Sequence, residues 1–359
     1  MSSHRRSSLR PLHVVVAGGG IAGMEALLAL RTLTGDALPL TLVSPAEQLH
    51  YRPTAVLEPF GARATRRYEL AEVCADLDVT HRRDALAAVD GAARELRTEG
   101  GERIAYDALV LAPGARPGVG LPHAQTFFAD AQSERLRRTV RELEQGAVRR
   151  MAFVVPPGRV WPLPAYELAL MTAAHVRAAG LDGVQLALVT PEDVPLALFR
   201  GAGSAAVEER LAAAGVHFLG GAYAHDYDGL ALALAPGART LDADRVVALP
   251  VLAGPSLGGV PSDANGFVHV DERGRVPGLS DVYAAGDATT FAIKQGGIAA
   301  QQADAVATLI ARAAGASLPE PSTRPLLRAV LLDGDNPLYL RATIAGGESV
   351  ASSASRHCP

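Results

Sequence analysis

A short glycine-rich stretch near the amino terminus has the composition of a phosphate-binding turn. It reads GGGIAG, a G-x-G-x-x-G pattern that follows an apolar run and opens a segment with helical apolar spacing. In such a strand–turn–helix the first glycine allows a tight turn, the second lets a pyrophosphate approach the backbone, and the third lets helix pack on strand. The helix N-terminus adds N–H groups and partial positive charge. The predicted dinucleotide contacts are Gly18, Gly20, Ile21, Ala22 and Gly23.

The chain also holds one lysine, Lys294, whereas the other 33 of its 34 lysine and arginine residues are arginine. An arginine guanidinium is large and keeps its proton. A lysine ammonium is compact, can change its pKa and can donate a proton. Lys294 stands directly before 295–314, a segment with helical apolar spacing. It is therefore a candidate for charge stabilisation or proton donation. The alternative is that a drift of composition toward arginine left one lysine by accident.

Two further buried-strand patterns end in tight turns of small residues. One is YDALVLAPG at 106–114, and the other is VYAAGDATTF at 282–291. The strand that follows the first predicted helix, 38–44, ends in Ser44, where dinucleotide-binding units usually carry an acidic residue for the ribose. A serine hydroxyl can still hydrogen-bond a ribose, although less strongly than a carboxylate.

These two stretches and the glycine turn, in this order and at these separations, resemble the FAD-dependent pyridine nucleotide-disulfide oxidoreductase superfamily. The resemblance covers roughly residues 12–345. In that family the first turn lies near FAD, while the second supplies an aspartate for the ribitol and a glycine N–H near the phosphates. The resemblance therefore implies FAD as the cofactor. Besides the glycine turn, it implies cofactor contacts from Ser44, Arg52, Pro53, Ala85, Ala112, Pro113, Gly114, Gly286, Asp287, Gly297 and Ile298.

Within the superfamily, HYRPTAVLEPFG (50–61) and KQGGIAAQQADAVA (294–307) are most similar to the branch of type II NADH dehydrogenases and sulfide:quinone oxidoreductases. In that branch a long helix points its N-terminus at the pyrimidine end of the flavin, where a helix dipole stabilises negative charge. The resemblance places Lys294 facing the flavin. Trp161 and Tyr166, with the 50–60 loop, are expected to line a substrate pocket beside the flavin. The predicted catalytic residues are Lys294, Trp161 and Tyr166.

The sequence departs from that branch in two ways. PPGRVWPLPAYE (156–167) replaces the second G-x-G-x-x-G of NADH-using members, and proline has no N–H to donate to a pyrophosphate. Only Glu192 or Asp193 offers a ribose contact there, which disfavours ordinary NAD(P)H binding. The position of one redox cysteine of sulfide:quinone members falls near Trp161 in this chain. The segment that corresponds to the second redox cysteine, 326–335, also holds no cysteine. A cysteine relay for sulfide is therefore not expected.

The composition argues against several other classes of function. A net charge of −4 gives no basic field for nucleic acid, and the histidines are scattered without the spacing of metal ligands. No apolar run reaches the ~18–20 residues of a membrane span, and no amphipathic anchor is visible near the polar, Ser-rich C-terminus. The two cysteines form no disulfide framework, which fits a cytoplasmic protein. Peripheral membrane contact and a homodimer stay open.

The order of elements predicts an α/β fold with two Rossmann-like dinucleotide-binding (FAD/NAD(P)-binding) domains, the second inserted in the first, plus a short C-terminal segment. A helix is expected over 67–77, and short antiparallel strands over 78–105. The expected divisions are a disordered tail (1–11), an FAD-binding domain (12–118 and 264–324), a second, NAD(P)-like domain (119–263), and C-terminal strands with a polar tail (325–359).

The function favoured by these features is an FAD-dependent oxidoreductase. A small-molecule reductant would reduce FAD, and a second small-molecule acceptor such as a quinone would take the electrons. Two alternatives stay open. The first is an NAD(P)H dehydrogenase with a non-standard second domain. The second is a flavin-binding scaffold or regulatory protein without turnover, which the missing cysteines and the missing second glycine loop motivate.

Overall fold

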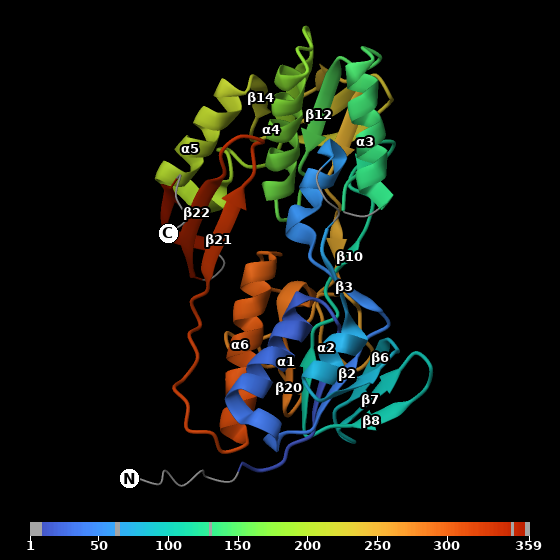
Figure 1. Cartoon of the computed structure of the whole chain (residues 1–359), viewed down its shortest axis with the longest axis vertical. Coiled ribbons are helices and arrows are strands. Elements are labelled where there is room, and N and C mark those ends of the chain that lie inside the picture. Colours follow the sequence, from blue (N-terminus) through green and yellow to red (C-terminus); the bar gives the residue numbers. More distant parts are fainter. Residues whose placement is uncertain (1–8, 62–64, 129–130, 346–347, 356–359) are drawn as a thin grey trace. The chain divides into compact units, whose positions relative to one another are not determined.

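The computed structural model describes residues 9–61, 65–128, 131–345 and 348–355, and the chain divides into two compact units (Figure 1). Unit 1 consists of residues 1–50, 67–116 and 253–325, and unit 2 of 51–66, 117–252 and 326–359. Of the expected tail, 1–11, residues 1–8 lie outside the described residues. Beyond that point the chain is fixed, because the N–H of Arg10 donates to the carbonyl of Ala314 at 2.8 Å.

Unit 1 is built on a five-stranded parallel sheet. Its strands, in spatial order, are β20 (Val282–Ala284), β9 (Ala108–Leu111), β1 (Val14–Ala17), β2 (Leu40–Val43) and β5 (Val79–Arg82). The expectation of antiparallel strands over 78–105 was therefore wrong at its start, since β5 joins the parallel sheet. The expected helix over 67–77 begins as strand β4 (Arg67–Glu69), which pairs with β3 (Gln48–His50), and continues as helix α2 (Leu70–Asp76).

The alternation of side chains along β1 explains the layers of unit 1. Val14 and Val16 face helices α1 (Ile21–Thr34) and α6 (Gly296–Ala313), which lie side by side in Figure 1. Val15 and Ala17 face the opposite core. Successive strand residues point to opposite faces, so an unbroken apolar strand must be covered on both sides. The second cover is an antiparallel sheet made of β6 (Leu86–Asp90), β7 (Glu95–Thr98) and β8 (Arg103–Ala105).

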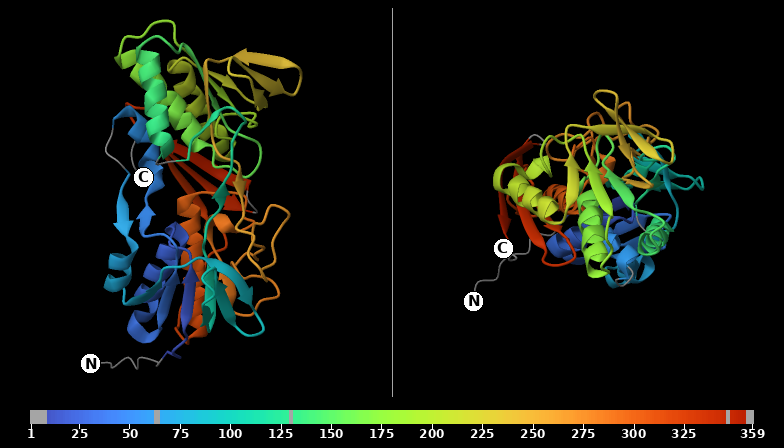
Figure 2. Two further views of the ribbon diagram at one scale, coloured as in Figure 1. Left: turned by 90° about the vertical axis from the view of Figure 1, so that its right-hand side faces the viewer. Right: turned by 90° about the horizontal axis from the view of Figure 1, so that it is seen from above.

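Unit 2 repeats this plan. Its parallel sheet has the order β11 (Gln125–Thr126), β18 (Arg245–Ala248), β12 (Arg150–Val154), β13 (Gln185–Val189) and β14 (Val216–Leu219). Its helices are the 3-10 helix η2 (Arg52–Phe60) and α3 (Ala131–Glu144), α4 (Leu163–Ala178) and α5 (Arg200–Ala213). An antiparallel sheet covers the other face and stands out in gold in the left view of Figure 2. Its strands are β15 (Tyr223–Tyr227), β16 (Ala231–Ala235) and β17 (Arg239–Asp242). Two of the five passages of the chain between the units fall within short strands, β10 (Arg116–Pro117) and β19 (Leu252–Ala253).

The C-terminal residues form a second antiparallel sheet in unit 2, made of β21 (Leu326–Leu331), β22 (Leu338–Ala345) and β23 (Glu348–Ser355). Strand β23 lies in the segment that was expected to be a polar tail. The sequence did not predict it because a Ser-rich stretch has no alternation of apolar residues. The sheet packs on α4 and α5 and buries Leu327, Leu331 and Leu340. This explains why the segment joins unit 2 and does not stand alone. Within the described ranges, no helix combines the length and the apolarity that crossing a bilayer requires.

Candidate functional site

The ends of the five parallel strands of unit 1 lie in one row. The register pairs Ala17 with Val43 on one side and with Leu111 on the other, and it continues outward to Arg82 and Ala284. Each of these is the last residue of its strand. Loops that follow aligned parallel strands meet at one edge of the sheet, which is where open α/β sheets bind ligands. The glycine turn, Ser44, Ala85, the 112–114 turn and the Gly286–Asp287 turn all follow this row.

The glycine turn is tightly packed at two positions and open at a third. A Cβ on Gly18 would lie 2.1 Å from the carbonyl oxygen of Ala112, and the φ of Gly18 is +122°. A Cβ on Gly23 would lie 1.8 Å from the carbonyl oxygen of Gly18. At Gly20, by contrast, the described chain places no atom within 4 Å of the Cβ position. Helix α1 begins at the next residue, so its first N–H groups border this space. The opening therefore suits a pyrophosphate.

The turn after β20 is pressed against both helices. Gly286 has a φ of +77°, and a Cβ there would lie 2.9 Å from the Cβ of Ala22 and 3.3 Å from that of Ala299. Its N–H donates to Oε1 of Gln302 at 2.8 Å. This N–H was expected near the phosphates. In this structure it is used inside the protein, because α6 presents a glutamine to it. Asp287, the next residue, remains the predicted partner of the ribitol.

The other turns at this edge are held by hydrogen bonds of their backbone N–H groups. The hydroxyl oxygen of Ser44 accepts from the N–H of Ala46 at 3.3 Å, and the residue is 1% exposed. The N–H of Ala85 donates to Asp84 at 2.7 Å. The N–H of Ala112 donates to the carbonyl of Ala17 at 2.7 Å, and the turn goes on through Pro113 to Gly114, whose φ is +75°. The cofactor contacts of these residues remain predictions.

Helix α6 starts where the sequence placed it, with Gln295 as its N-cap. The side-chain oxygen of Gln295 accepts from the N–H of Ile298 at 2.8 Å. A Cβ on Gly297 would lie 3.1 Å from that same oxygen. Because the first-turn N–H groups of a helix have no acceptor within it, those of Gly296 and Gly297 are available to a ligand. The predicted contact through the N–H of Ile298 competes with the cap, whereas that of Gly297 does not.

Lys294 lies directly before this helix and is only 4% exposed. Its Nζ donates to the carbonyl of Thr289 at 2.5 Å and lies 4.1 Å from the centre of the Phe267 ring. All three residues belong to unit 1. A lysine is rarely this buried unless it is paired, so a composition accident does not explain its surroundings. Its contact with the flavin remains a prediction.

The two other predicted catalytic residues belong to unit 2, as does the Arg52–Pro53 segment. Tyr166 is fully buried, and its hydroxyl donates to Glu192 at 2.7 Å and accepts from the N–H of Leu196 at 3.1 Å. Burial, followed by the charge of Glu192, raises the pKa of this phenol. These contacts favour a structural role for Tyr166. Trp161 is half-buried and packs edge-on against Phe199, with ring centres 6.3 Å apart.

Arg52 and Pro53 open η2 and are exposed within unit 2. The guanidinium of Arg52 lies 4.5 Å from the centre of the Phe128 ring. The rest of η2 is fixed to unit 2 because Arg137 donates to the carbonyl of Glu58 at 2.7 Å. A flavin contact from Arg52 or Pro53 remains a prediction.

At the edge of the unit 2 sheet, side chains that follow β13 are turned inward. Glu192, which follows β13 and was a candidate for a ribose, turns inward. Its carboxylate accepts from Tyr166, from Thr190 at 3.1 Å and from the N–H of Ala197 at 2.9 Å. Burial raises the pKa of Glu192. Phe199 is fully buried in the same region. The second domain therefore keeps the fold of a dinucleotide-binding domain, while Glu192 is used in contacts within the protein.

Two residues with unusual surroundings gave little signal in the sequence. Glu167 is 3% exposed on α4, and burial raises its pKa to about 8. Its only signal was an acidic residue inside the apolar stretch YELALM. Phe267 touches Lys294 but lies 27 positions away in a loop, so no local pattern connects the two residues.

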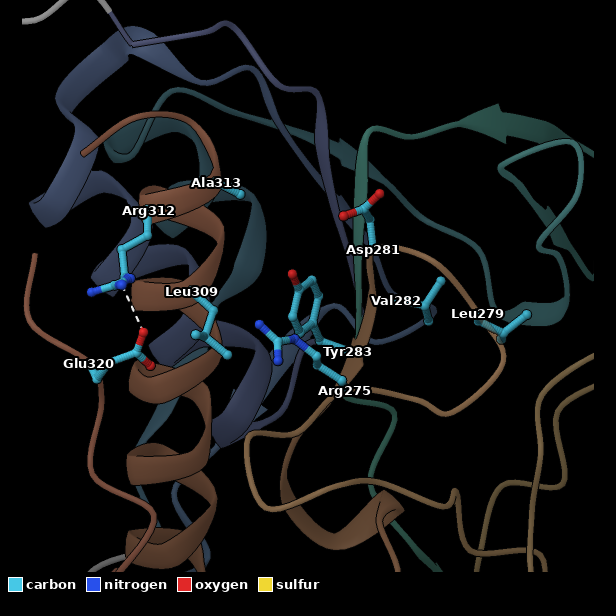
Figure 3. Close-up of a pocket in the computed structure, with 9 residues that line it drawn as sticks. All are labelled: Arg275, Leu279, Asp281, Val282, Tyr283, Leu309, Arg312, Ala313 and Glu320. Atoms are coloured by element: carbon cyan, nitrogen blue, oxygen red, sulfur yellow. Dashed lines mark hydrogen bonds and ion pairs between the residues drawn. The ribbon is translucent and has the colours of Figure 1, made fainter. Parts of the chain in front are cut away.

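A charged cavity of about 420 Å³ lies elsewhere in unit 1 (Figure 3). Tyr283 and Arg275 stand at its centre, and Asp281 marks the amino end of β20. The glycine turn lies at the opposite, carboxyl edge of the same sheet. Glu320, also in the cavity lining, pairs with Arg312 at 2.7 Å. We therefore assign the cofactor to the strand-end edge and not to this cavity.

Comparison with known proteins agrees with this geometry. Residues 12–303 match the family described as "Pyridine nucleotide-disulphide oxidoreductase". The chain belongs to this family. The family's proteins are FAD-dependent oxidoreductases, so the predicted superfamily, FAD as cofactor and the class of enzyme are confirmed. The open space at Gly20 beside the start of α1 is where the residues present fit the pyrophosphate of FAD.

Individual relatives place the chain further. It is 28% identical over 189 residues to the sulfide-quinone reductase of Aquifex aeolicus (strain VF5), an alignment that covers 50% of this chain and 43% of that protein. The chain thus aligns with less than half of this curated relative. The solved sulfide:quinone oxidoreductase of Aquifex aeolicus superposes with a TM-score of 0.83 at 22% identity, over 96% of this chain and 87% of that one. A ferredoxin reductase of Rhodopseudomonas palustris gives 0.70 at 20% identity, over 93% and 83%. These structures confirm the two-domain fold.

Proposed function

We propose that this protein passes electrons from a small reductant other than NAD(P)H, through FAD, to a quinone. The observation that carries the proposal is the contrast between two equivalent sheet edges. At the unit 1 edge the Cβ position of Gly20 is open and helix α1 begins at the next residue. At the unit 2 edge the Cβ position of Gly158 is open as well, but two prolines precede it, and Glu192 and Phe199 are turned inward after β13. A nicotinamide nucleotide needs a cleft with free backbone donors for its pyrophosphate. The PPG turn after β12 offers few such donors, because proline has none.

Quinone is the acceptor named in the relative that aligns with this chain, a sulfide-quinone reductase. Sulfide as the donor is not supported by the residues. Trp161 stands where the sequence comparison expected a redox cysteine, and Cys74 is buried with a pKa raised by burial to about 11. A thiol attacks as its thiolate, so Cys74 is a poor nucleophile. The donor is thus a reductant that needs no cysteine relay.

The chain's own residues have separate tasks in this reaction. FAD, when bound, supplies the two-electron chemistry. The glycine turn and the start of α1 would hold its pyrophosphate, and Asp287 its ribitol. Lys294 and the N-terminus of α6 would stabilise the negative charge that reduction brings to the pyrimidine end of the flavin.

One set of spectra tests the proposal. The purified protein, loaded with FAD, is mixed without oxygen with dithionite, sulfide, NADH and NADPH in turn, and then with a soluble quinone. We expect bound FAD, bleaching by dithionite, no bleaching by millimolar NADH or NADPH beyond that of free FAD, and reoxidation by the quinone. Free FAD treated identically is the control.

The alternatives correspond to other results of this experiment. Rapid bleaching by NADH or NADPH would establish the dehydrogenase with a non-standard second domain. Bound FAD that quinones reoxidise no faster than free FAD would establish the scaffold without turnover. A protein that takes up no FAD would refute all three. A cytoplasmic location and a homodimer remain predictions from the sequence.

A further inference from the structure

The ammonium of Lys294 is enclosed by two groups of unit 1. Nζ lies over the face of the Phe267 ring, 4.1 Å from the ring centre. The ammonium also donates a hydrogen bond to the carbonyl of Thr289. Phe267 is 1% exposed and Thr289 is fully buried. We call these two residues the Lys294 cradle.

The ring of Phe267 is held in place by its own loop. The N–H of Phe267 donates to Oδ1 of Asp263 at 2.9 Å, and the N–H of Asp263 donates to the carbonyl of Phe267 at 2.9 Å. Gly254 presses on the same peptide, because a Cβ there would lie 2.2 Å from the nitrogen of Phe267. These contacts fix the backbone of Phe267 without involving Lys294.

The carbonyl half of the cradle is fixed as well, and it is tied to the cofactor edge. The N–H and the hydroxyl of Thr289 both donate to the carbonyl of Gly286, at 3.1 and 3.0 Å. The N–H of Thr290 donates to Val268, the neighbour of Phe267, at 2.9 Å. The two halves of the cradle thus belong to adjoining segments, and one of them continues directly from the Gly286–Asp287 turn.

Both halves favour a charged lysine. The negative face of an aromatic ring attracts a cation, and an interaction of this kind is stronger away from water. A carbonyl oxygen likewise accepts a stronger hydrogen bond from an ammonium than from a neutral amine. An amine that gave up its proton would lose the attraction of the ring. The geometry therefore favours a fixed positive charge at Lys294 over a proton donor.

We propose that Phe267 is a positioning residue that holds the Lys294 ammonium and, through it, raises the midpoint potential of the flavin. This inference rests on the proposed function, which places Lys294 beside the flavin. It adds a residue that no sequence pattern connected to the site. It also favours a fixed positive charge at Lys294 over the alternative role of a proton donor. Phe267 acts through Lys294, so removing the lysine must cancel its effect.

The test replaces Phe267 by phenylalanines carrying one, two and three ring fluorines, which weaken the negative face while keeping the shape of the side chain. The midpoint potential of bound FAD is measured for each, with Lys294 present and in Lys294→Met. We expect the potential to fall stepwise with each fluorine when Lys294 is present, toward the value of Lys294→Met, and not to change in the Lys294→Met series. Fluorination of Phe153, a buried phenylalanine of unit 2, is the control for general effects.

Each other result has a distinct meaning. A protein that binds no FAD would overturn the proposed function and, with it, the inference that rests on it. If FAD binds and Lys294→Met lowers the potential, but fluorination of Phe267 leaves it unchanged, the cradle is overturned and the proposed function stands. Equal fluorine effects with and without Lys294 would show that Phe267 acts on the flavin by another route and would also overturn the inference. An unchanged potential in Lys294→Met would overturn both the predicted role of Lys294 and its cradle.

Discussion

Three of the four glycines of GGGIAG, Gly18, Gly20 and Gly23, lack a side chain for different reasons. Gly18 and Gly23 have neighbouring backbone where a side chain would go, whereas Gly20 has open space. The first two glycines therefore serve the fold, and the third serves the ligand. Adding one methyl group at a time separates these tasks.

Gly20→Ala should leave the protein folded and weaken its hold on FAD. The φ of Gly20 is −82°, which alanine adopts freely, and the methyl group enters empty space. We expect the free energy of unfolding of the apoprotein to change by no more than about 0.5 kcal/mol. FAD affinity should fall at least ~10-fold, or about 1.4 kcal/mol. Calorimetry of the apoprotein and titration with FAD measure the two quantities.

Gly18→Ala is the matched variant. Its methyl group would meet the carbonyl of Ala112 in a backbone conformation that alanine rarely adopts, so we expect loss of folded protein and not a selective loss of FAD. A Gly20→Ala protein that retains FAD as tightly as the wild type would contradict the assignment of the phosphate site.

The loop between β21 and β22 shows how separate elements are joined. Leu332 donates its N–H to Glu167 of α4 at 3.2 Å, and Asp335 pairs with Arg177 of α4 at 2.6 Å. Asp333 pairs with Arg210 of α5. This loop fastens the C-terminal sheet to the helices of unit 2, and one of its partners, Glu167, is a buried carboxyl.

Glu167 should make stability fall as the pH rises. Its pKa is about 8 in the folded protein, against an ordinary value of 4.5. Between these values the folded state holds a proton that the unfolded state has released, so raising the pH favours unfolding, by at most about 1.4 kcal/mol per pH unit. Below pH 4.5 the group has no such effect. Glu167→Gln keeps an acceptor for Leu332 and cannot titrate. Its free energy of unfolding relative to that of the wild type should therefore increase from pH 5 to pH 8.

Thermal unfolding of both proteins across this range gives the measurement. Glu208→Gln, on the exposed face of α5, is the control for the general effect of replacing a carboxyl by an amide. A constant difference between wild type and Glu167→Gln at all pH values would show that Glu167 is not held protonated.

The two units share one plan. In unit 1 the strands β1, β2 and β5 lie in order with β9 on the other side of β1, and in unit 2 the strands β12, β13 and β14 lie in order with β18 on the other side of β12. By our proposal only the edge of unit 1 binds a dinucleotide. The chain therefore carries two dinucleotide-binding folds and, by our proposal, a single dinucleotide.

This division can be followed with two optical signals. Trp161 is the only tryptophan and belongs to unit 2, whereas FAD is assigned to unit 1. Leu340 is 2% exposed in β22 and packs near Gly203 of α5. Leu340→Ala should cost about 2–5 kcal/mol, so we expect the Trp161 transition to move to lower temperature by more than the release of FAD. Val330→Ala, on the exposed side of β21, should change little.

Equal shifts of both signals in Leu340→Ala would show instead that the two units unfold as a single cooperative block. The comparison is made on the same FAD-loaded sample, so differences in cofactor content do not enter.

Much of the fold could be predicted from the sequence because its signals are local. The strand before Gly18, the apolar spacing of α1 and the start of α6 at Gly296 each depend on residues close together in the chain. β23 was missed because alternating serines and alanines do not show which face is buried. β5 was assigned to the wrong sheet because the sequence of a short strand does not specify its partner.

The sequence by itself determined the family and the cofactor, since both are written in short motifs, and the rarity of lysine made Lys294 a candidate whose role stays a prediction. The tertiary structure alone decided that Glu192 and Phe199 turn inward after β13, that Gln302 takes the N–H of Gly286, and that Phe267 lies against Lys294. These contacts join residues from separate elements, and folding, not proximity in the chain, brings them together. The direction of a buried side chain depends on what packs around it, which no local pattern records.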